Sequence, residues 1–370
     1  MKLNLFSGLF LLLLFTCLPY PIRVLGRDEG MFYPLISKPL NHLCKLLGVQ
    51  DFNPNLLSDG KMQYLLLLCI FIIACLAFLL LLKLDINKSK LLSYLRKLNL
   101  LILSFFLIRY GFDKLFGGQF DIVEGNLLQQ ELQFFDKDLL FWVTVQSSSF
   151  FNIASGILEI IAGLSILNSF TRKFGILLAL LSTSFILLIN ISFDINVKIL
   201  SLGLFLQAIY ALSPYLKNIK EVLFPSTKMV VLYRDSDVHF MKSWKLSLFI
   251  LFCISESVII PIQYNKQEYI WANSYAIEGS TTSFIHLHSD EFLIEQNGNH
   301  FSSNKVQIIP KSENQFKIIG KNINSSLILN SDNQSLFITE EDTLKVRIVD
   351  FGKSAYLQDD FHLYTENSLK

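Results

Sequence analysis

Seven apolar runs, each about as long as a membrane-crossing helix, constrain this chain more than any other feature of its sequence. An α-helix needs about 20 apolar residues to cross a hydrocarbon core of roughly 30 Å. Of the 370 residues, 52% are hydrophobic and 17% are charged, whereas soluble proteins average about 25% charged residues. The sequence therefore predicts an α-helical polytopic membrane protein with about seven transmembrane helices. The expected spans are residues 3–18, 64–82, 98–116, 143–167, 174–193, 197–212 and 246–262.

Basic residues concentrate in alternate loops between these spans. Lysine and arginine are densest in the second, fourth and sixth loops, which contain Lys88, Lys173 and Lys220 respectively. The positive-inside rule places such loops in the cytoplasm, so we expect a cytoplasmic N-terminus and an extracytoplasmic C-terminal region. The first span follows Lys2 and precedes Pro19, and it is either a retained helix or a signal peptide. We favour the retained helix.

From residue 266 the pattern changes to short β-rich runs separated by turn residues. Such spacing predicts a C-terminal all-β extramembrane domain, either a meander or a small barrel. His286 and His288 face one side of a strand, and without a third ligand we interpret them as ordinary strand histidines rather than a metal site. The expected strands are 283–287, 315–319, 326–329, 335–339 and 345–349, and the expected turns are 297–299, 310–312 and 331–333.

Ionisable residues inside the apolar runs are the main functional signal, because charge at membrane depth is costly and usually marks a site. The third span ends in Arg109, Asp113 and Lys114. Arg109 and Asp113 are four residues apart and can pair on one helix face. Glu159 lies in the middle of the fourth span, and Arg109 is its natural partner at comparable depth. Lys114 either reaches Glu159 through Arg109 or water, or anchors the helix at the interface.

A second group of polar residues marks the junction of the fifth and sixth spans. Asn190, Asp194 and Lys198 gather there, either as part of a cluster with Lys114 and Gln119 or as a solvated helix end. Gln207, in the sixth span, is expected to form an interhelical hydrogen bond. The predicted intramembrane polar cluster comprises Arg109, Asp113, Lys114, Gln119, Glu159, Asn190, Asp194 and Lys198.

The remaining composition argues against several classes of function. The five cysteines form no C-x-x-C pair, and the sequence contains no evident metal-ligand set, Ser/His/Asp set, phosphate loop or dinucleotide fingerprint. The net charge of +1 comes without a basic stripe, which disfavours nucleic acid as a partner. Catalytic residues are therefore left unassigned, and no metal is expected. Membrane lipid is the expected partner, together with a partner subunit of a membrane complex.

Several motifs resemble those of the DoxX-like family of bacterial integral membrane proteins. The first is Tyr110-Gly111-x-x-Lys114 followed by Gln119-Phe120. The next ones, in the order expected of the family, are Ser149 with Gly156-x-x-Glu159-x-x-x-Gly163, Thr171-Arg172, and Leu188-Ile189-Asn190 with Asp194-x-x-Val197-Lys198. The flanking Ser58-Asp59-Gly60 and Phe361-His362 are similar to a longer subfamily with a C-terminal β-rich region.

This resemblance implies a four-helix core in a protein of the bacterial inner membrane, with a periplasmic or extracellular β domain. We expect five parts. They are 1–61, the first span and outer loop; 62–96, the second span and basic loop; 97–215, the DoxX-like core; 216–265, a basic loop and the seventh span; and 266–370, the β-rich outer domain.

Three functions are compatible with this organisation. The lack of redox cysteine pairs, flavin motifs and metal-ligand sets disfavours self-sufficient catalysis, so we favour an accessory or scaffold component of a membrane complex. The alternative is the membrane subunit of a quinone-linked oxidoreductase system, in which a quinone is the cofactor at the polar cluster. A transporter of small solutes or lipids is the third hypothesis, disfavoured because the sequence shows no broken pair of half-helices or inverted repeat. Whether the protein is an enzyme stays open.

Overall fold

The structure is a computed structural model of the 370-residue chain, and it divides into two compact units. Unit 1 comprises residues 1–119 and 153–262, and unit 2 comprises residues 120–152 and 263–370. The residues described are 1–18, 33–48, 59–116, 119, 135–216, 247–256, 273–280, 282–287, 292–298, 300–312, 314–321, 323–329, 335–339 and 342–349.

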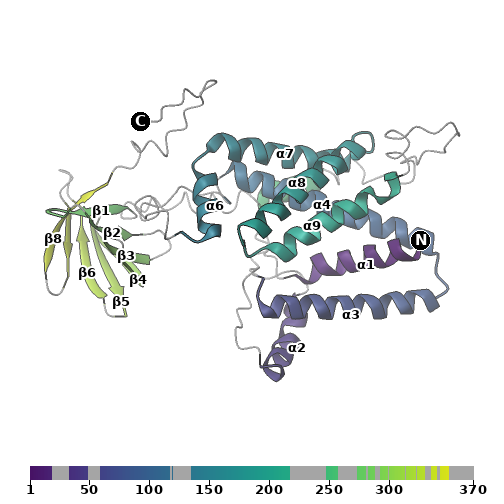
Figure 1. The fold of residues 1–370 in the computed structure, drawn as a ribbon, viewed down its shortest axis with the longest axis horizontal. Helices are drawn as coiled ribbons and strands as arrows, with labels where there is room; N and C mark the ends of the chain where they lie inside the picture. The colour runs from purple at the N-terminus through teal and green to yellow at the C-terminus, as the bar shows by residue number, and fades with distance from the viewer. Residues whose placement is uncertain are drawn as a thin grey trace. The chain divides into compact units, whose positions relative to one another are not determined.

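Helices dominate the first 256 residues (Figure 1). Among the described residues, four are long and apolar enough to cross a membrane, namely α3, α4, α7 and α8. A membrane protein is thereby supported, whereas the count of about seven spans is not confirmed. The helices are α1 Lys2–Cys17, α2 Tyr33–Leu46, α3 Lys61–Lys83, α4 Lys88–Leu115, α6 Lys137–Gln146, α7 Ser149–Leu167, α8 Arg172–Ser192, α9 Lys198–Leu212 and the unlabelled helix Ser247–Glu256.

Two expected boundaries are wrong. The basic segment before the third span is mostly helix rather than loop, because α4 begins at Lys88, where the Asn87 side chain accepts a hydrogen bond from the Lys90 amide at 3.0 Å. The expected fourth span is divided between α6 and α7 at Ser147 and Ser148. Serine hydroxyls compete for backbone groups and so favour helix ends. Here Ser147 Oγ donates to the Thr144 carbonyl at 2.7 Å.

Helix α1 is the centre of the packing in unit 1, because it contacts α3, α4 and α9, and α4 also contacts α9 (Figure 1). Against it, α3 buries Met62, Leu66, Ile70 and Ala74, which recur every four residues and so form one helix face. The opposite face of α3 is apolar and exposed, with Leu68 at 53%. An exposed face of that composition is typical of a helix that contacts lipid or another apolar helix.

The C-terminal unit contains a closed barrel in which each antiparallel strand pairs with the next and β8 pairs with β1 (Figure 1). The expected all-β domain is therefore confirmed as a barrel. Its apolar core includes Tyr275, Leu293, Ile318 and Leu327, each fully buried. Burial raises the pKa of the Tyr275 hydroxyl. The strands are β1 Ser274–Ile277, β2 Ser283–Leu287, β3 Phe292–Asn297, β4 His300–Ser312, β5 Gln315–Gly320, β6 Ile323–Ile328, β7 Ser335–Ile338 and β8 Thr343–Ile348.

The three expected turns have different outcomes. The turn at 297–299 is confirmed, since Asn297 pairs with His300 and Gly298 has a φ of 59°, which a glycine adopts readily. The expected turn at 310–312 is wrong, because these residues form the end of β4. The β4–β5 register shifts there, between Pro310 and Ser312, and a proline in a strand is typically found at such an irregularity. The turn at 331–333 lies outside the described residues.

His286 is buried and hydrogen-bonded through both ring nitrogens. Its Nδ1 lies 2.7 Å from Ser274 Oγ and its Nε2 lies 2.9 Å from Gln296 Oε1. The Gln296 amide donates to the Gly298 carbonyl at 3.0 Å, so its oxygen is the atom that accepts from His286. These contacts fit the interpretation of His286 as a structural strand histidine. His288 lies outside the described residues.

Candidate functional site

Helices α4 and α7 approach each other so closely that their backbones are in contact. A Cβ atom on Gly111 would lie 2.6 Å from the Gly156 carbonyl oxygen, and one on Gly156 would lie 2.7 Å from the Gly111 oxygen. About two turns further along, Ser104 Oγ donates to the Gly163 carbonyl at 2.7 Å. Small residues at a crossing point allow this approach in membrane proteins. The glycines therefore determine which side chains of α4 and α7 can meet.

The best-defined polar contact beside this crossing is the ion pair between Lys114 of α4 and Glu159 of α7. Lys114 Nζ donates to Glu159 Oε2 at 2.7 Å, and the two side chains are only 7% and 5% exposed. The ammonium group also lies 5.8 Å from the centre of the Tyr110 ring, within the range of a cation–π interaction. Lys114 therefore binds Glu159 directly, neither through Arg109 nor through water, and its ammonium is not an interfacial anchor.

Arg109 lies beside the expected carboxylate of Asp113 and beside a second, unexpected one, that of Glu256. Its Nε lies 3.8 Å from Asp113 Oδ2, and its Nη1 lies 3.9 Å from Glu256 Oε2. Arg109 and Glu256 are 1% and 0% exposed. The expected pairing of Arg109 with Glu159 is wrong, since Lys114 is the only ion-pair partner of Glu159 in the part of the chain that the structure describes. Lys114 reaches it because the glycine crossing brings α7 against the last turns of α4.

Glu256 is a member of this site that the sequence analysis missed. It lies in the last apolar run, at the end of the helix Ser247–Glu256. The signal was available, because an acidic residue inside an apolar run deserves the same attention as Glu159. With Glu256 included, Arg109 joins α4 to this short helix, as Lys114 joins α4 to α7. We call Arg109, Asp113, Lys114, Glu159 and Glu256 the α4 charge network.

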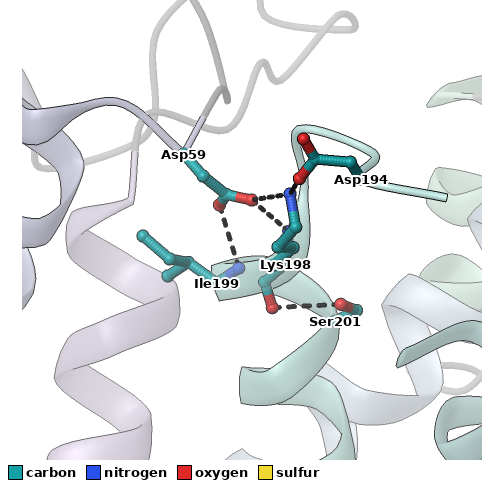
Figure 2. Close-up of polar contacts among 5 residues, drawn as sticks. All are labelled: Asp59, Asp194, Lys198, Ile199 and Ser201. Atoms are coloured by element: carbon teal, nitrogen blue, oxygen red, sulfur yellow. Dashed lines mark hydrogen bonds and ion pairs between the residues drawn. The ribbon is translucent and has the colours of Figure 1, made fainter. Parts of the chain in front are cut away.

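A second polar group occupies the junction of α8 and α9. Lys198 Nζ lies 2.7 Å from Asp194 Oδ1 and 3.9 Å from Asp59 Oδ2, and Figure 2 shows both carboxylates directed at the ammonium group. Asp59 also accepts hydrogen bonds from the backbone amides of Lys198 at 2.6 Å and Ile199 at 3.0 Å. Asp59 thus caps the N-terminus of α9, which has no cap of its own. Sequence reasoning gave Asp59 no role beyond a family motif.

The eight predicted cluster residues are therefore only partly brought together. Neither Asp59 nor Lys198 forms an ion pair with Lys114 or Glu159 within the described ranges, so a single cluster of all eight stays a prediction. Asn190 is 5% exposed, and its carbonyl accepts from the Ile195 amide at 3.0 Å. Gln119 donates its backbone amide to the Asp113 carbonyl at 3.1 Å, which places it at the end of α4.

The interhelical hydrogen bond expected of Gln207 is confirmed. Gln207 Nε2 on α9 donates to Asn99 Oδ1 on α4 at 3.1 Å, and both residues are buried. Asn99 in turn donates to the Gly8 carbonyl of α1 at 2.9 Å. This chain of amides joins three helices. It contains no ionisable group, and we assign it to packing.

The described residues contain no group of three or more His, Cys, Asp or Glu side chains that could hold a metal ion. Comparison with protein-family models, curated proteins and solved structures finds no match to this chain. The resemblance to the DoxX-like family therefore stays a prediction.

Proposed function

We propose that the protein is an accessory component of a membrane complex, similar in role to a DoxX-like scaffold, whose α4 charge network fixes the arrangement of its helices. The observation that supports this is the buried 2.7 Å ion pair between Lys114 and Glu159. It joins two helices that already touch backbone to backbone at Gly111 and Gly156. A contact of this kind specifies one register between α4 and α7.

The energetics of buried charge support a bracing role. A lone charge inside the membrane costs several kcal/mol or more, and breaking a buried pair typically costs about 3–5 kcal/mol because it leaves the other charge uncompensated. Lys114 and Glu159 compensate each other, while Arg109 faces both Asp113 and Glu256. Because these charges are paired with one another inside the protein, they do not need partners at its surface. The outer apolar faces, such as that of α3, can then contact lipid or the helices of a partner subunit.

A quinone-linked membrane subunit is the second candidate. It is favoured by the position of the Lys114 ammonium, which lies between the Glu159 carboxylate and the face of Tyr110. A quinone head group needs a hydrogen-bond donor beside an apolar, aromatic wall. Lys114 supplies the donor and Tyr110 supplies the aromatic surface. Under this proposal Glu159 would hold a proton for the quinone head group, and a partner subunit carrying a redox cofactor would supply the electrons.

A double substitution distinguishes the two candidates. Lys114→Met with Glu159→Leu removes both charges and keeps apolar volume, a change that is often neutral for the stability of a buried pair. If the protein is a scaffold, the double variant is expected to complement a deletion strain. Either single substitution is expected to lower the amount of protein in the membrane. Normal abundance of the double variant with no complementation would overturn the scaffold proposal and support the redox subunit.

We also propose that the chain lies in the bacterial inner membrane, with Lys88, Lys173 and Lys220 in the cytoplasm and residues 266–370 in the periplasm. The alternation of basic loops supports this orientation. A periplasm-dependent reporter fused after Leu369 is expected to be active, and the same reporter fused after Lys88 is expected to be inactive. The opposite pattern would reverse the proposed orientation.

A further inference from the structure

The outer surface of strands β4 and β5 is lined by lysines and isoleucines. Along each strand, side chains alternate between the barrel core and the outside. Val306, Phe316 and Ile318 are buried in the core, so residues 305, 307 and 309 of β4 and residues 317 and 319 of β5 face outward. Lys311 lies at the register shift between Pro310 and Ser312 and is exposed. Lys321, which directly follows β5, is exposed. We call Lys305, Ile309, Lys311, Lys317, Ile319 and Lys321 the β4–β5 surface.

Cross-strand pairing arranges these residues as a small apolar patch with a basic border. Ile309 lies opposite Lys317, and Ile319 lies opposite Gln307. Both isoleucines are exposed, at 38% and 36%. At one end of the ribbon, the pairing of Val306 with Gly320 brings Lys305 and Lys321 side by side. At the other end, Lys311 lies two residues beyond Ile309.

These four lysines have no carboxylate to neutralise them within the part of the chain that the structure describes. Neither Lys305, Lys311, Lys317 nor Lys321 forms an ion pair there. The outward residues of the neighbouring strand β6, Asn324 and Ser326, are uncharged. Like charges on adjacent strands destabilise a sheet. An uncompensated basic patch is more often a solvated face, but exposed isoleucines inside it favour a contact surface.

We infer that the β4–β5 surface binds an anionic phospholipid bilayer. The charge of the surface is complementary to lipid phosphate, and each lysine near an anionic membrane contributes about 1 kcal/mol of attraction. The isoleucines add apolar contact at the boundary between headgroups and acyl chains. An acidic protein would match the charge as well, but the bilayer is always present, because the same chain contains helices long enough to cross it.

Chain connectivity keeps the barrel close to that bilayer. Residues 257–272 join the helix Ser247–Glu256 to the first described residue of the barrel unit. A segment of that length reaches at most about 60 Å when fully extended. A tether of this reach gives the membrane surface a high effective concentration around the barrel. Even weak binding by four lysines and two isoleucines is then enough to keep a substantial fraction of the barrels bound to the bilayer.

The experiment measures lysine accessibility in the full-length protein. The protein is reconstituted into nanodiscs of phosphatidylcholine, or of phosphatidylcholine mixed equally with phosphatidylglycerol. A membrane-impermeant amine reagent then labels it, and mass spectrometry reports the labelling rate at each lysine. Lys345 on β8 is the internal control, because β8 and β4 are on opposite sides of a closed eight-stranded barrel. The rates at the four β4–β5 lysines are expected to fall several-fold relative to Lys345 in the anionic discs only.

Variants and salt sharpen the result. Removing one lysine, as in Lys311→Gln, is expected to lower the ratio of membrane-bound to membrane-free barrel about fivefold. Lys345→Gln is expected to leave this ratio unchanged. Molar salt is expected to abolish the protection, since the Debye length falls to about 3 Å. Equal labelling in both kinds of disc overturns the proposal. Protection in native membranes but not in purified anionic discs overturns it as well, and assigns the surface to an acidic protein partner.

Discussion

Two ion pairs of the helical unit have the same length but lie in opposite surroundings. Lys114 and Glu159 are 2.7 Å apart, with side chains 7% and 5% exposed. Lys198 and Asp194 are also 2.7 Å apart, but they are 25% and 83% exposed. The first pair joins residues 45 positions apart on two helices, and the second joins residues four positions apart at one helix junction.

The distance between two charges does not by itself determine how much an ion pair contributes to stability. Two unit charges at 4 Å attract each other by about 1 kcal/mol in water and by about 4 kcal/mol at an effective dielectric constant of 20. Burial also raises the cost of losing one partner, because the remaining charge has no water to solvate it. Loss of the buried pair should therefore destabilise the packing of α4 against α7, whereas loss of the exposed pair should have little effect on stability.

The largest expected effect is that of Glu159→Leu. This change leaves the buried Lys114 ammonium without its carboxylate, and breaking a buried pair in this way typically costs about 3–5 kcal/mol. The measurement is the apparent melting temperature of the detergent-solubilised protein, followed by helical ellipticity. The double variant Lys114→Met with Glu159→Leu is the matched control, expected to melt close to the wild type. A single variant as stable as the double one would contradict the role given to burial.

The next effect concerns the glycine crossing that brings the buried pair together. Gly111→Ala places a Cβ 2.6 Å from the Gly156 carbonyl oxygen, so the two backbones must separate. Overpacking of this kind costs about 1–3 kcal/mol. Gly203→Ala is the control, since its nearest neighbours are side-chain atoms of Leu14 and Phe15 at 3.1 Å, which can move. If both variants lose the same stability, the crossing has no special importance.

The parts of this architecture that depend on local pattern were predictable from the sequence. Apolar runs located α3 and α8 well, and strand alternation with turn residues located the β-rich unit. Glu159 was recognised because it is a charge in the middle of an apolar run. The N-terminal part of α4 was missed, because hydropathy reports only the apolar portion of a helix, and the basic residues from Lys88 onwards are good helix formers.

The choice of partners could not be predicted, because it depends on distances between helices. Arg109 and Lys114 were both candidate ion-pair partners of Glu159, and a difference of a few ångströms in the distance to its carboxylate decides which of them pairs with it. The capping of α9 by Asp59 joins residues 139 positions apart, and nothing in the local sequence indicates it. Glu256 was different, since the rule that selected Glu159 applies to it equally.

Removal of the Asp59 cap is expected to have a smaller effect than either change at the α4–α7 crossing. Asp59→Ala leaves the Lys198 and Ile199 amides without their acceptor, and loss of a helix cap costs about 0.5–2 kcal/mol. The measurement is hydrogen exchange in the first turn of α9, which should become several-fold faster. Asp59→Asn keeps one of the two acceptor oxygens and is the comparison variant, with an exchange rate expected between those of the wild type and the alanine variant. Unchanged exchange in the alanine variant would show that solvent replaces the cap.

The smallest effect is expected for Asp194→Asn, which breaks the exposed pair without altering the backbone. Asp194 has a φ of 55°, a conformation that asparagine tolerates at least as well as aspartate, so the substitution removes little except the charge. Pairs this exposed contribute at most about 1 kcal/mol, and often nothing measurable. The melting temperature should therefore change little, and any difference should vanish in molar salt, which screens exposed charges. Lys198 keeps its second carboxylate, Asp59, which reduces the effect further. A loss as large as that of Glu159→Leu would mean that burial does not separate the two pairs.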